Sequence, residues 1–287
     1  MNLATHRIST KKHYNEAKAK NFTEKQRCIT AIKLLCQLTK AVQHHRGASM
    51  AYLGGEEFFM PQLEQLQEDI HTILLLLKET VGCHALTEED LAALDANWNT
   101  ILVGWQQDQF MHNFEFHSHV IDELKKLLRH CREELIPDTE NRLQFEQLLR
   151  FLLETLFDNI ESMAKLRGLS TNAAVVKACG QDAHSRISFL LKEIPEQNQQ
   201  IITELNALKP FYRHLTTLEQ LKLQEKSLHR LLLSIQIQIL DTPDITINGS
   251  TLFNLATDII NSRWKELGQG IEIVDQSVFD GLVFNSF

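Results

Sequence analysis

Apolar residues recur along much of the chain at intervals of three and four, the spacing that places them on one face of an α-helix. The first clear run is Ile29, Ile32, Leu35, Cys36, Leu38, Thr39 and Val42. Thr23 is a suitable N-cap, so this run predicts a helix that begins at Glu24 and ends at Gly54 and Gly55, after the string HHRGASMAYL.

Three more helices are predicted by the same spacing before the middle of the chain. They cover roughly residues 61–82, 87–105 and 115–135. Thr87-Glu-Glu-Asp resembles a capping arrangement for the second of these helices. The segment Pro137-Asp138-Thr139 then supplies both a helix stop and a new N-cap, so it is the best place to divide the chain.

The helical pattern restarts after this division. Apolar positions within residues 148–160 predict a helix that leads into the string AKLRGLSTNAAVV. Residues 196–240 are expected to form one long helix, or two helices broken at Lys209-Pro210, because proline disrupts a helix interior. Two shorter helices are expected at about residues 182–192 and 251–267, and the string DTPDITING before the last one is turn-rich.

The composition agrees with an all-α fold, since eleven glycines and five prolines are few for 287 residues. We predict two pseudo-repeated antiparallel helical bundles packed together. The helical domain covers residues 23–270, with halves at about 23–136 and 137–270. Residues 1–22 are expected to be a polar, loosely ordered segment. Residues 271–287 form a tail with little helical period, whose three phenylalanines predict docking on the body or on a partner.

The charge balance excludes a general attraction to nucleic acid or to an anionic membrane. Lys and Arg total 29 against 37 Asp and Glu, a net charge of -8. The N-terminal stretch has no apolar signal-peptide region, and the longest apolar run, residues 73–77, is far below the ~20 residues of a membrane span. We therefore expect a cytoplasmic protein without direct membrane or nucleic-acid contact.

The cysteines are odd in number and widely scattered, with no CxxC pair. They are Cys28, Cys36, Cys83, Cys131 and Cys179. This pattern predicts reduced thiols rather than a disulfide framework or a structural zinc site.

An Arg-Gly-x-Ser step occurs twice in similar helical context. Arg46, Gly47 and Ser49 align with Arg167, Gly168 and Ser170, at an offset of 167 - 46 = 121 residues. Glycine inside a helix costs about 1 kcal/mol relative to alanine, so two matching glycines indicate close backbone approach or a local bend. Guanidinium groups suit small oxyanions, because they present a planar fork of donors. These six residues are therefore the candidate anion-binding site.

At these residues the chain resembles the nitrate- and nitrite-sensing (NIT) domain family of bacterial signalling proteins. Residues 42–53 are similar to the family's Leu-Gln-x-Glu-Arg-Gly-x-Ser string, with His45 where an acidic residue is usual. HSHVIDELKKLL at residues 117–128 resembles the family's next helix. Residues 250–261 resemble its late helix, with Asn261 where Asp is usual. The resemblance covers roughly residues 25–270.

The resemblance implies a helical sensor that binds nitrate or nitrite through arginines from both halves, a role carried over to Arg46 and Arg167 only. Family members usually continue into an output module, and we expect none in this chain. We therefore expect a stand-alone sensor, not an enzyme, that needs no cofactor and signals through helix displacement to a protein partner. Whether it forms a homodimer is left open.

One hypothesis for the mechanism is that the two arginines face one cavity and repel each other until an anion draws the halves together. Ser49 and Ser170 could add hydrogen bonds, although a serine in a helix more often bonds its own backbone. The simpler interpretation is that each arginine is an ordinary surface residue or pairs with a nearby carboxylate such as Glu161.

Two other functions stay open. Glu115 and His119 lie four residues apart, a spacing used by metal sites in helical bundles, but His71 and His184 lack the matching Glu-x-x-His context, so no metal ligand is assigned.

A pure interaction module without a small ligand is the other alternative. The tryptophans are expected in the core rather than in a binding box. They are Trp98, Trp105 and Trp264. Catalysis has little support, because no phosphate loop and no nucleophile beside a base is evident.

Overall fold

The structure, a computed structural model, describes residues 3–80, 85–136, 142–211 and 218–283. Throughout these ranges the regular elements are helices and no strand occurs, so the all-α prediction is confirmed. In chain order the α-helices are α1 (Leu3–Leu53), α2 (Met60–Glu79), α3 (Glu88–Leu102), α4 (Phe110–Leu135), α5 (Arg142–Arg150), α6 (Phe157–Val176), α7 (Gln181–Leu208), α8 (Leu218–Ile235) and α9 (Gly249–Val283). Short 3-10 and π segments join some of them: η1 (Glu57–Phe59), η2 (Trp105–Gln107), η3 (Phe151–Leu156) and η4 (Gln236–Leu240).

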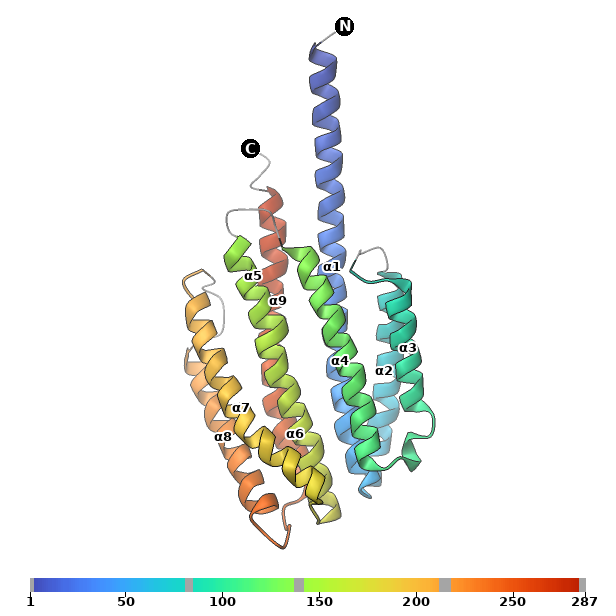
Figure 1. Ribbon diagram of the computed structural model, residues 1–287, viewed down its shortest axis with the longest axis vertical. Helices are drawn as coiled ribbons and strands as arrows, with labels where there is room; N and C mark the ends of the chain where they lie inside the picture. The colour runs from blue at the N-terminus through green and yellow to red at the C-terminus, as the bar shows by residue number, and fades with distance from the viewer. Residues whose placement is uncertain (1–2, 81–84, 137–141, 212–217, 284–287) are drawn as a thin grey trace.

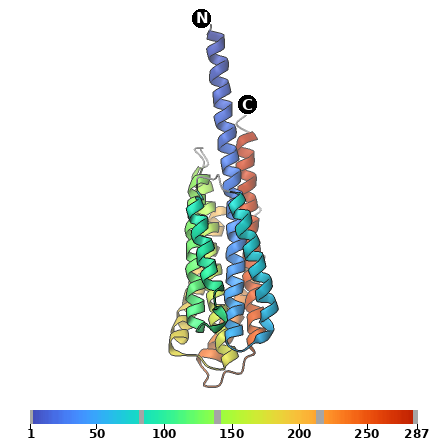
Figure 2. The same cartoon turned by 90° about the vertical axis from the view of Figure 1, so that its right-hand side faces the viewer.

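The helices run up and down along one long axis, and sequence neighbours are mostly antiparallel (Figures 1 and 2). Helix α1 packs against α2 and α4, while α6 packs against α7 and α9. Helix α1 also contacts α6 and α9, so it joins the two groups of helices. A single large apolar cluster contains residues from both groups. The pseudo-repeat relation between the two halves stays a prediction.

Helix α1 begins much earlier than the sequence pattern indicates. It runs from Leu3 to Leu53, so Thr23 lies inside the helix and is not its N-cap. The polar N-terminal segment is thus the first part of this helix, and it extends well beyond the rest of the molecule (Figure 1). The apolar spacing marks only the part of α1 that is buried, because polar stretches of a helix carry no period.

Helix α7 is also longer than expected. It continues from Gln181 through Pro195 to Leu208, where a break between residues 192 and 196 was expected. Ile194 and Ile201 are buried on either side of this proline, so packing of the apolar face outweighs the missing backbone hydrogen bond. The predicted break at Lys209-Pro210 is confirmed, since α7 ends at Leu208. The predicted division at Pro137-Asp138-Thr139 lies outside the described residues.

The separate tail predicted for residues 271–287 is wrong for its described part. Helix α9 continues to Val283, and its buried positions follow helical spacing. They are Leu267, Ile271, Val274 and Val278. Three of these residues are β-branched, which lowers intrinsic helix propensity and hides the period, but their burial against the body decides the conformation.

The start and end of α3 have clear local causes. Thr87 forms the expected capping box, in which its hydroxyl accepts from the Asp90 amide and the Asp90 carboxylate accepts from the Thr87 amide. The helix ends at Leu102, before Gly104 takes a left-handed conformation with φ of 74°. Trp105, expected in the same helix, lies in η2 instead.

The prediction of reduced cysteines is wrong for Cys28, which is disulfide-bonded. Cys36, Cys131 and Cys179 are free, and Cys83 lies outside the described residues. Burial raises the pKa of Cys131 to about 12, so this thiol is unreactive at neutral pH. Among the helices described here, none is both long and apolar enough to cross a lipid bilayer.

Candidate functional site

The two Arg-Gly-x-Ser steps lie together where α1 packs on α6. Arg46 and Arg167 are both completely buried. A Cβ on Gly47 would lie 2.9 Å from Nε and 3.1 Å from Nη2 of Arg167, so this guanidinium rests on the α1 backbone. A Cβ on Gly168 would lie 2.8 Å from Sδ of Met50. Both glycines therefore permit the close approach that the repeated sequence predicts.

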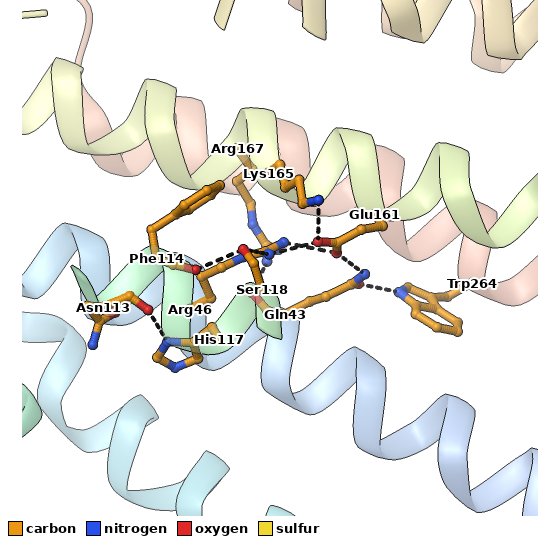
Figure 3. Close-up of polar contacts among 10 residues, drawn as sticks. All are labelled: Gln43, Arg46, Asn113, Phe114, His117, Ser118, Glu161, Lys165, Arg167 and Trp264. Carbon is orange, nitrogen blue, oxygen red and sulfur yellow. Dashed lines mark hydrogen bonds and ion pairs between the residues drawn. The ribbon is translucent and has the colours of Figure 1, made fainter. Parts of the chain in front are cut away.

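Arg46 is held by a carboxylate from the neighbouring helix α6 (Figure 3). Its Nη1 lies 2.7 Å from Oε1 of Glu161, and its Nη2 lies 3.0 Å from Oε2. Nη1 also donates to the Ser118 hydroxyl at 3.0 Å, and the guanidinium carbon lies 5.2 Å from the centre of the Phe114 ring. The fork of Arg46 is thus filled in a bidentate manner, the strongest form of guanidinium recognition.

Gln43 connects this ion pair to α9. Its Nε2 donates to Oε2 of Glu161 at 2.8 Å, and its Oε1 accepts from the indole Nε1 of Trp264 at 3.1 Å. Gln43 lies one turn before Arg46 on α1 and is fully buried. The carboxylate of Glu161 therefore links α1 and α6 directly and α9 through one amide (Figure 3).

Arg167 has uncharged partners. Its Nη2 donates to the backbone carbonyl of Gln43 at 2.6 Å, and its Nη1 donates to the Thr257 hydroxyl of α9 at 3.0 Å. Its guanidinium carbon lies 4.9 Å from the centre of the Phe253 ring. The two hydrogen bonds to neutral oxygens orient the guanidinium, and so does the ring face, but none of these contacts neutralises its charge.

The buried cluster carries more positive than negative charge. Among the described residues of this cluster, the carboxylate is that of Glu161, which pairs with Arg46 and acts on Arg167 only through its charge. The partly exposed Lys165 lies on its other side, with Nζ 3.7 Å from Oε1. Burial and, to a smaller extent, the charge of Arg46 lower the pKa of Arg167, and Glu161 opposes the shift, so that the pKa is about 9. Arg167 is still protonated at neutral pH, so one positive charge lies uncompensated in a low-dielectric setting.

Several donors in this cluster have no hydrogen-bond partner within the described part of the chain. They are Nε of Arg46, Nε of Arg167 and Nδ2 of Asn113. A buried donor without a partner costs about 1–3 kcal/mol. All three groups are N–H donors, so a ligand that supplies hydrogen-bond acceptors could satisfy them.

Ser49 and Ser170 use their hydroxyls locally. The Ser170 hydroxyl donates to the Leu166 carbonyl at 2.6 Å. The Ser49 hydroxyl lies 3.0 Å from the Arg46 carbonyl and 2.7 Å from Oδ1 of Asn113, both of which accept. The expected preference of a helical serine for its own backbone is observed at Ser170, whereas the shorter contact of Ser49 is with the Asn113 side chain of α4.

His45, at the position where the resembled family has an acidic residue, belongs to a buried histidine pair that the sequence did not reveal. His117 Nδ1 donates to the Asn113 carbonyl at 2.7 Å, which leaves its Nε2 to accept from Nδ1 of His45 at 2.8 Å. His45 Nε2 then accepts from Gln67 at 3.1 Å. Burial lowers the pKa of His117 to about 3 and that of His45 well below its ordinary value, and the pair is neutral at pH 7.

Glu115, one of the residues weighed for a metal site, has another partner: it forms an ion pair with Arg186 at 2.7 Å. Across the described ranges, no group of three or more His, Cys, Asp or Glu side chains is placed to hold a metal ion.

The structure changes the hypothesis of two arginines that repel each other. The simpler interpretation gave each arginine a surface position or a carboxylate partner; Arg46 does pair with Glu161, but Arg167 is buried and keeps an excess charge. Sequence reasoning missed Gln43, Ser118 and Thr257. Gln43 did carry a signal, because it is a polar residue beside Val42 on the apolar stripe of α1. The tryptophans are buried, as expected.

The chain was compared with known protein families, with curated proteins and with solved structures, and no match was found in any of the three.

Proposed function

We propose that this protein is a sensor of a small oxyanion, with nitrate or nitrite as the first candidates, bound by Arg46 and Arg167. The observation that carries this proposal is the charge count of the cluster: two fully buried guanidiniums and one buried carboxylate. An uncompensated buried charge costs several kcal/mol, so a ligand that supplies one negative charge is stabilised there.

The same count indicates the class of ligand. A monoanion balances Arg167, whereas a dianion would leave an excess of negative charge. Both arginines lie at a tight contact between helices, which favours an anion of a few atoms. The unpaired donors favour an anion with several acceptor oxygens. Nitrate and nitrite meet all three conditions, and their planar oxygens match a guanidinium fork.

Helices α1 and α9 are the proposed route of the signal. Arg46 lies on α1, and Thr257, a partner of Arg167, lies on α9. The start of α1 and the end of α9 point toward the same end of the molecule (Figures 1 and 2). Lys33 of α1 pairs with Glu272 and Asp275 of α9 on the way there. A displacement of either helix at the site would therefore reach a protein partner docked at that end.

The cytoplasmic location expected from the sequence belongs to the same proposal. Fractionation of cells that express the protein tests it, with recovery among soluble cytoplasmic proteins as the expected result.

The binding test is isothermal titration calorimetry with sodium nitrate, nitrite and chloride. Nitrate or nitrite is expected to bind with a stoichiometry of one, and Arg167→Met to abolish binding while the protein stays folded, because this change removes an uncompensated charge. The matched control is Arg129→Gln, which removes an arginine from the exposed side of α4. Absence of nitrate and nitrite binding by the wild type, or unchanged binding by Arg167→Met, contradicts the proposal.

A second function, an interaction module without a small ligand, is favoured by one observation. The first part of α1 extends beyond the end of α9 (Figure 1). Light scattering of the chain with and without residues 3–22 tests this function. A change from a higher to a monomeric mass on truncation would support self-association through this part of α1.

A further inference from the structure

We propose that Glu161 is a displaceable internal anion, which occupies the fork of Arg46 until the ligand replaces it and which then pairs with Lys165. This inference rests on the proposed function, because it explains how the same site is regulated. It assigns to Glu161 the roles of setting ligand affinity and of converting binding into a change between helices.

The first step is the chemical likeness of the carboxylate and the proposed ligand. A carboxylate and a nitrate or nitrite ion are each planar, carry one negative charge and present two oxygens side by side. Glu161 makes the bidentate contact with Arg46 that such an ion would make, at 2.7 Å and 3.0 Å. The ligand and Glu161 therefore compete for the same two N–H groups.

The second step is that another cation is already within reach of Glu161. Lys165 lies one turn along the same helix, with its Nζ 3.7 Å from Oε1 of Glu161. The Glu161 side chain is 9% exposed and that of Lys165 is 32% exposed, so the carboxylate lies between a buried cation and a partly solvated one (Figure 3). Residues at positions i and i+4 of a helix face each other. Rotation of the Glu161 side chain therefore suffices for the exchange.

The third step is the consequence for the helices. At present Glu161 joins α6 to α1 through Arg46 and Gln43. Pairing with Lys165 instead keeps the carboxylate within α6, and the Nε2 of Gln43 loses its acceptor. Because the other end of the Gln43 amide accepts from Trp264 of α9, the exchange also alters the contact between α1 and α9.

Competition with Glu161 also makes the site selective for a planar oxyanion over chloride. A ligand must replace both hydrogen bonds of the fork at once, since otherwise one guanidinium N–H loses its partner. A spherical chloride ion cannot make the two parallel contacts that a planar oxyanion makes. Competition with Glu161 therefore disfavours chloride more than an unoccupied arginine would.

The experiment measures nitrate binding by calorimetry for the wild type, Glu161→Gln and Lys165→Met. Glu161→Gln keeps the shape of the side chain and removes its charge, so nitrate is expected to bind at least about tenfold more tightly. Lys165→Met removes the alternative partner and is expected to weaken binding several-fold. The matched control is Lys125→Met, because Lys125 is similarly exposed, at 28%, and pairs with Asp158 outside the site; its affinity is expected to be unchanged.

The outcomes separate this inference from the proposed function. If the wild type binds nitrate and Glu161→Gln binds it equally or more weakly, the competition is refuted and the anion sensor stands. If Lys165→Met binds like the wild type, Lys165 is not the second partner of Glu161. If neither the wild type nor Glu161→Gln binds nitrate or nitrite, the proposed function itself fails.

A second measurement follows nitrate binding in the wild type, in case Glu161→Gln does not fold, and needs one other variant only to assign the signal. The indole Nε1–H signal of Trp264, assigned in a nitrogen-15 spectrum by its loss in Trp264→Phe, is expected to shift when nitrate saturates the protein, because Gln43 has lost the carboxylate. Sodium chloride at the same concentration is expected to leave the signal in place. A Trp264 signal that does not respond to bound nitrate overturns the exchange.

Discussion

The guanidinium of Arg167 rests on the backbone of Gly47, the residue that follows the other arginine of the pair. A Cβ at position 47 would come within 2.9 Å of Nε of Arg167 and 3.0 Å of the Phe253 ring. The glycine of the first Arg-Gly step thus makes room for the arginine of the second. The position of Arg167 in the second Arg-Gly-x-Ser step therefore depends on the glycine of the first.

The two glycines predict different effects of the same substitution. Gly47→Ala forces Arg167 away from the Gln43 carbonyl and Thr257, so we expect a loss of about 1–3 kcal/mol in the free energy of unfolding. Gly168→Ala contacts only the flexible Met50 side chain, and the better helix propensity of alanine, about 1 kcal/mol, offsets the strain. Urea unfolding of both variants checks this, and a more costly Gly168→Ala would contradict it.

The charge count predicts which substitution in the Arg46–Glu161 pair lowers the free energy of unfolding more. Glu161→Gln leaves two buried guanidiniums without a carboxylate and is expected to cost about 3–5 kcal/mol. Arg46→Met leaves Glu161 beside Arg167 and Lys165, so its cost should be smaller. Unfolding in urea with chloride as the only added anion measures both. If Arg46→Met destabilises the protein as much as Glu161→Gln, or more, the charge of Glu161 does not stabilise Arg167.

The buried histidine pair predicts a loss of stability in acid. His117 and His45 stay neutral in the folded protein, whereas the unfolded chain takes up protons near pH 6.5. The unfolded state therefore binds more protons, and the free energy of unfolding falls as the pH drops from about 6.5 toward 3, by up to about 1.4 kcal/mol per pH unit and histidine.

Denaturant unfolding at pH 7, 6 and 5 measures this slope. His117→Gln is expected to reduce it, although the variant is less stable at pH 7 because its hydrogen bonds change. His119→Gln is the control, since His119 is exposed on the same helix and should leave the slope unaltered. The same slope in His117→Gln and in the wild type would assign the acid sensitivity to other groups.

The capping box of α3 predicts a local effect away from the site. Thr87→Ala removes the hydroxyl that accepts from the Asp90 amide at 3.1 Å, and we expect a loss of about 1 kcal/mol. Thr100→Ala, in the exposed last turns of the same helix, should be neutral or slightly stabilising. Thermal unfolding of the two variants distinguishes a capping effect from a general effect of threonine loss.

Much of the fold follows from the sequence, because burial of one face imposes a period of 3.6 residues. That period predicts α2, α4 and the start of α3, but it misses polar or β-branched parts of long helices. The first part of α1 and the end of α9 are the examples. Pro195 also shows that a local helix breaker yields to packing on both sides of it.

The candidate site was predictable only in part. Repetition of Arg-Gly-x-Ser singles out Arg46 and Arg167, and the structure brings both to one buried cluster. The partners that decide its charge lie on other helices: Glu161 is 115 residues from Arg46, and Thr257 is 90 from Arg167. Spacing along one helix carries no information on such contacts, so the excess charge becomes visible only when the helices are packed.

The length of α1 amplifies small rotations at Arg46 into larger displacements at the start of the helix. The helix has 51 residues, and Arg46 lies 46 - 3 = 43 residues from Leu3, about 65 Å at 1.5 Å per residue. A tilt of about 2° at the arginine would swing the far end through about 2 Å, the scale of helix shifts that switch other proteins. A side-chain exchange inside the bundle would thus reach that end as the movement of a lever arm.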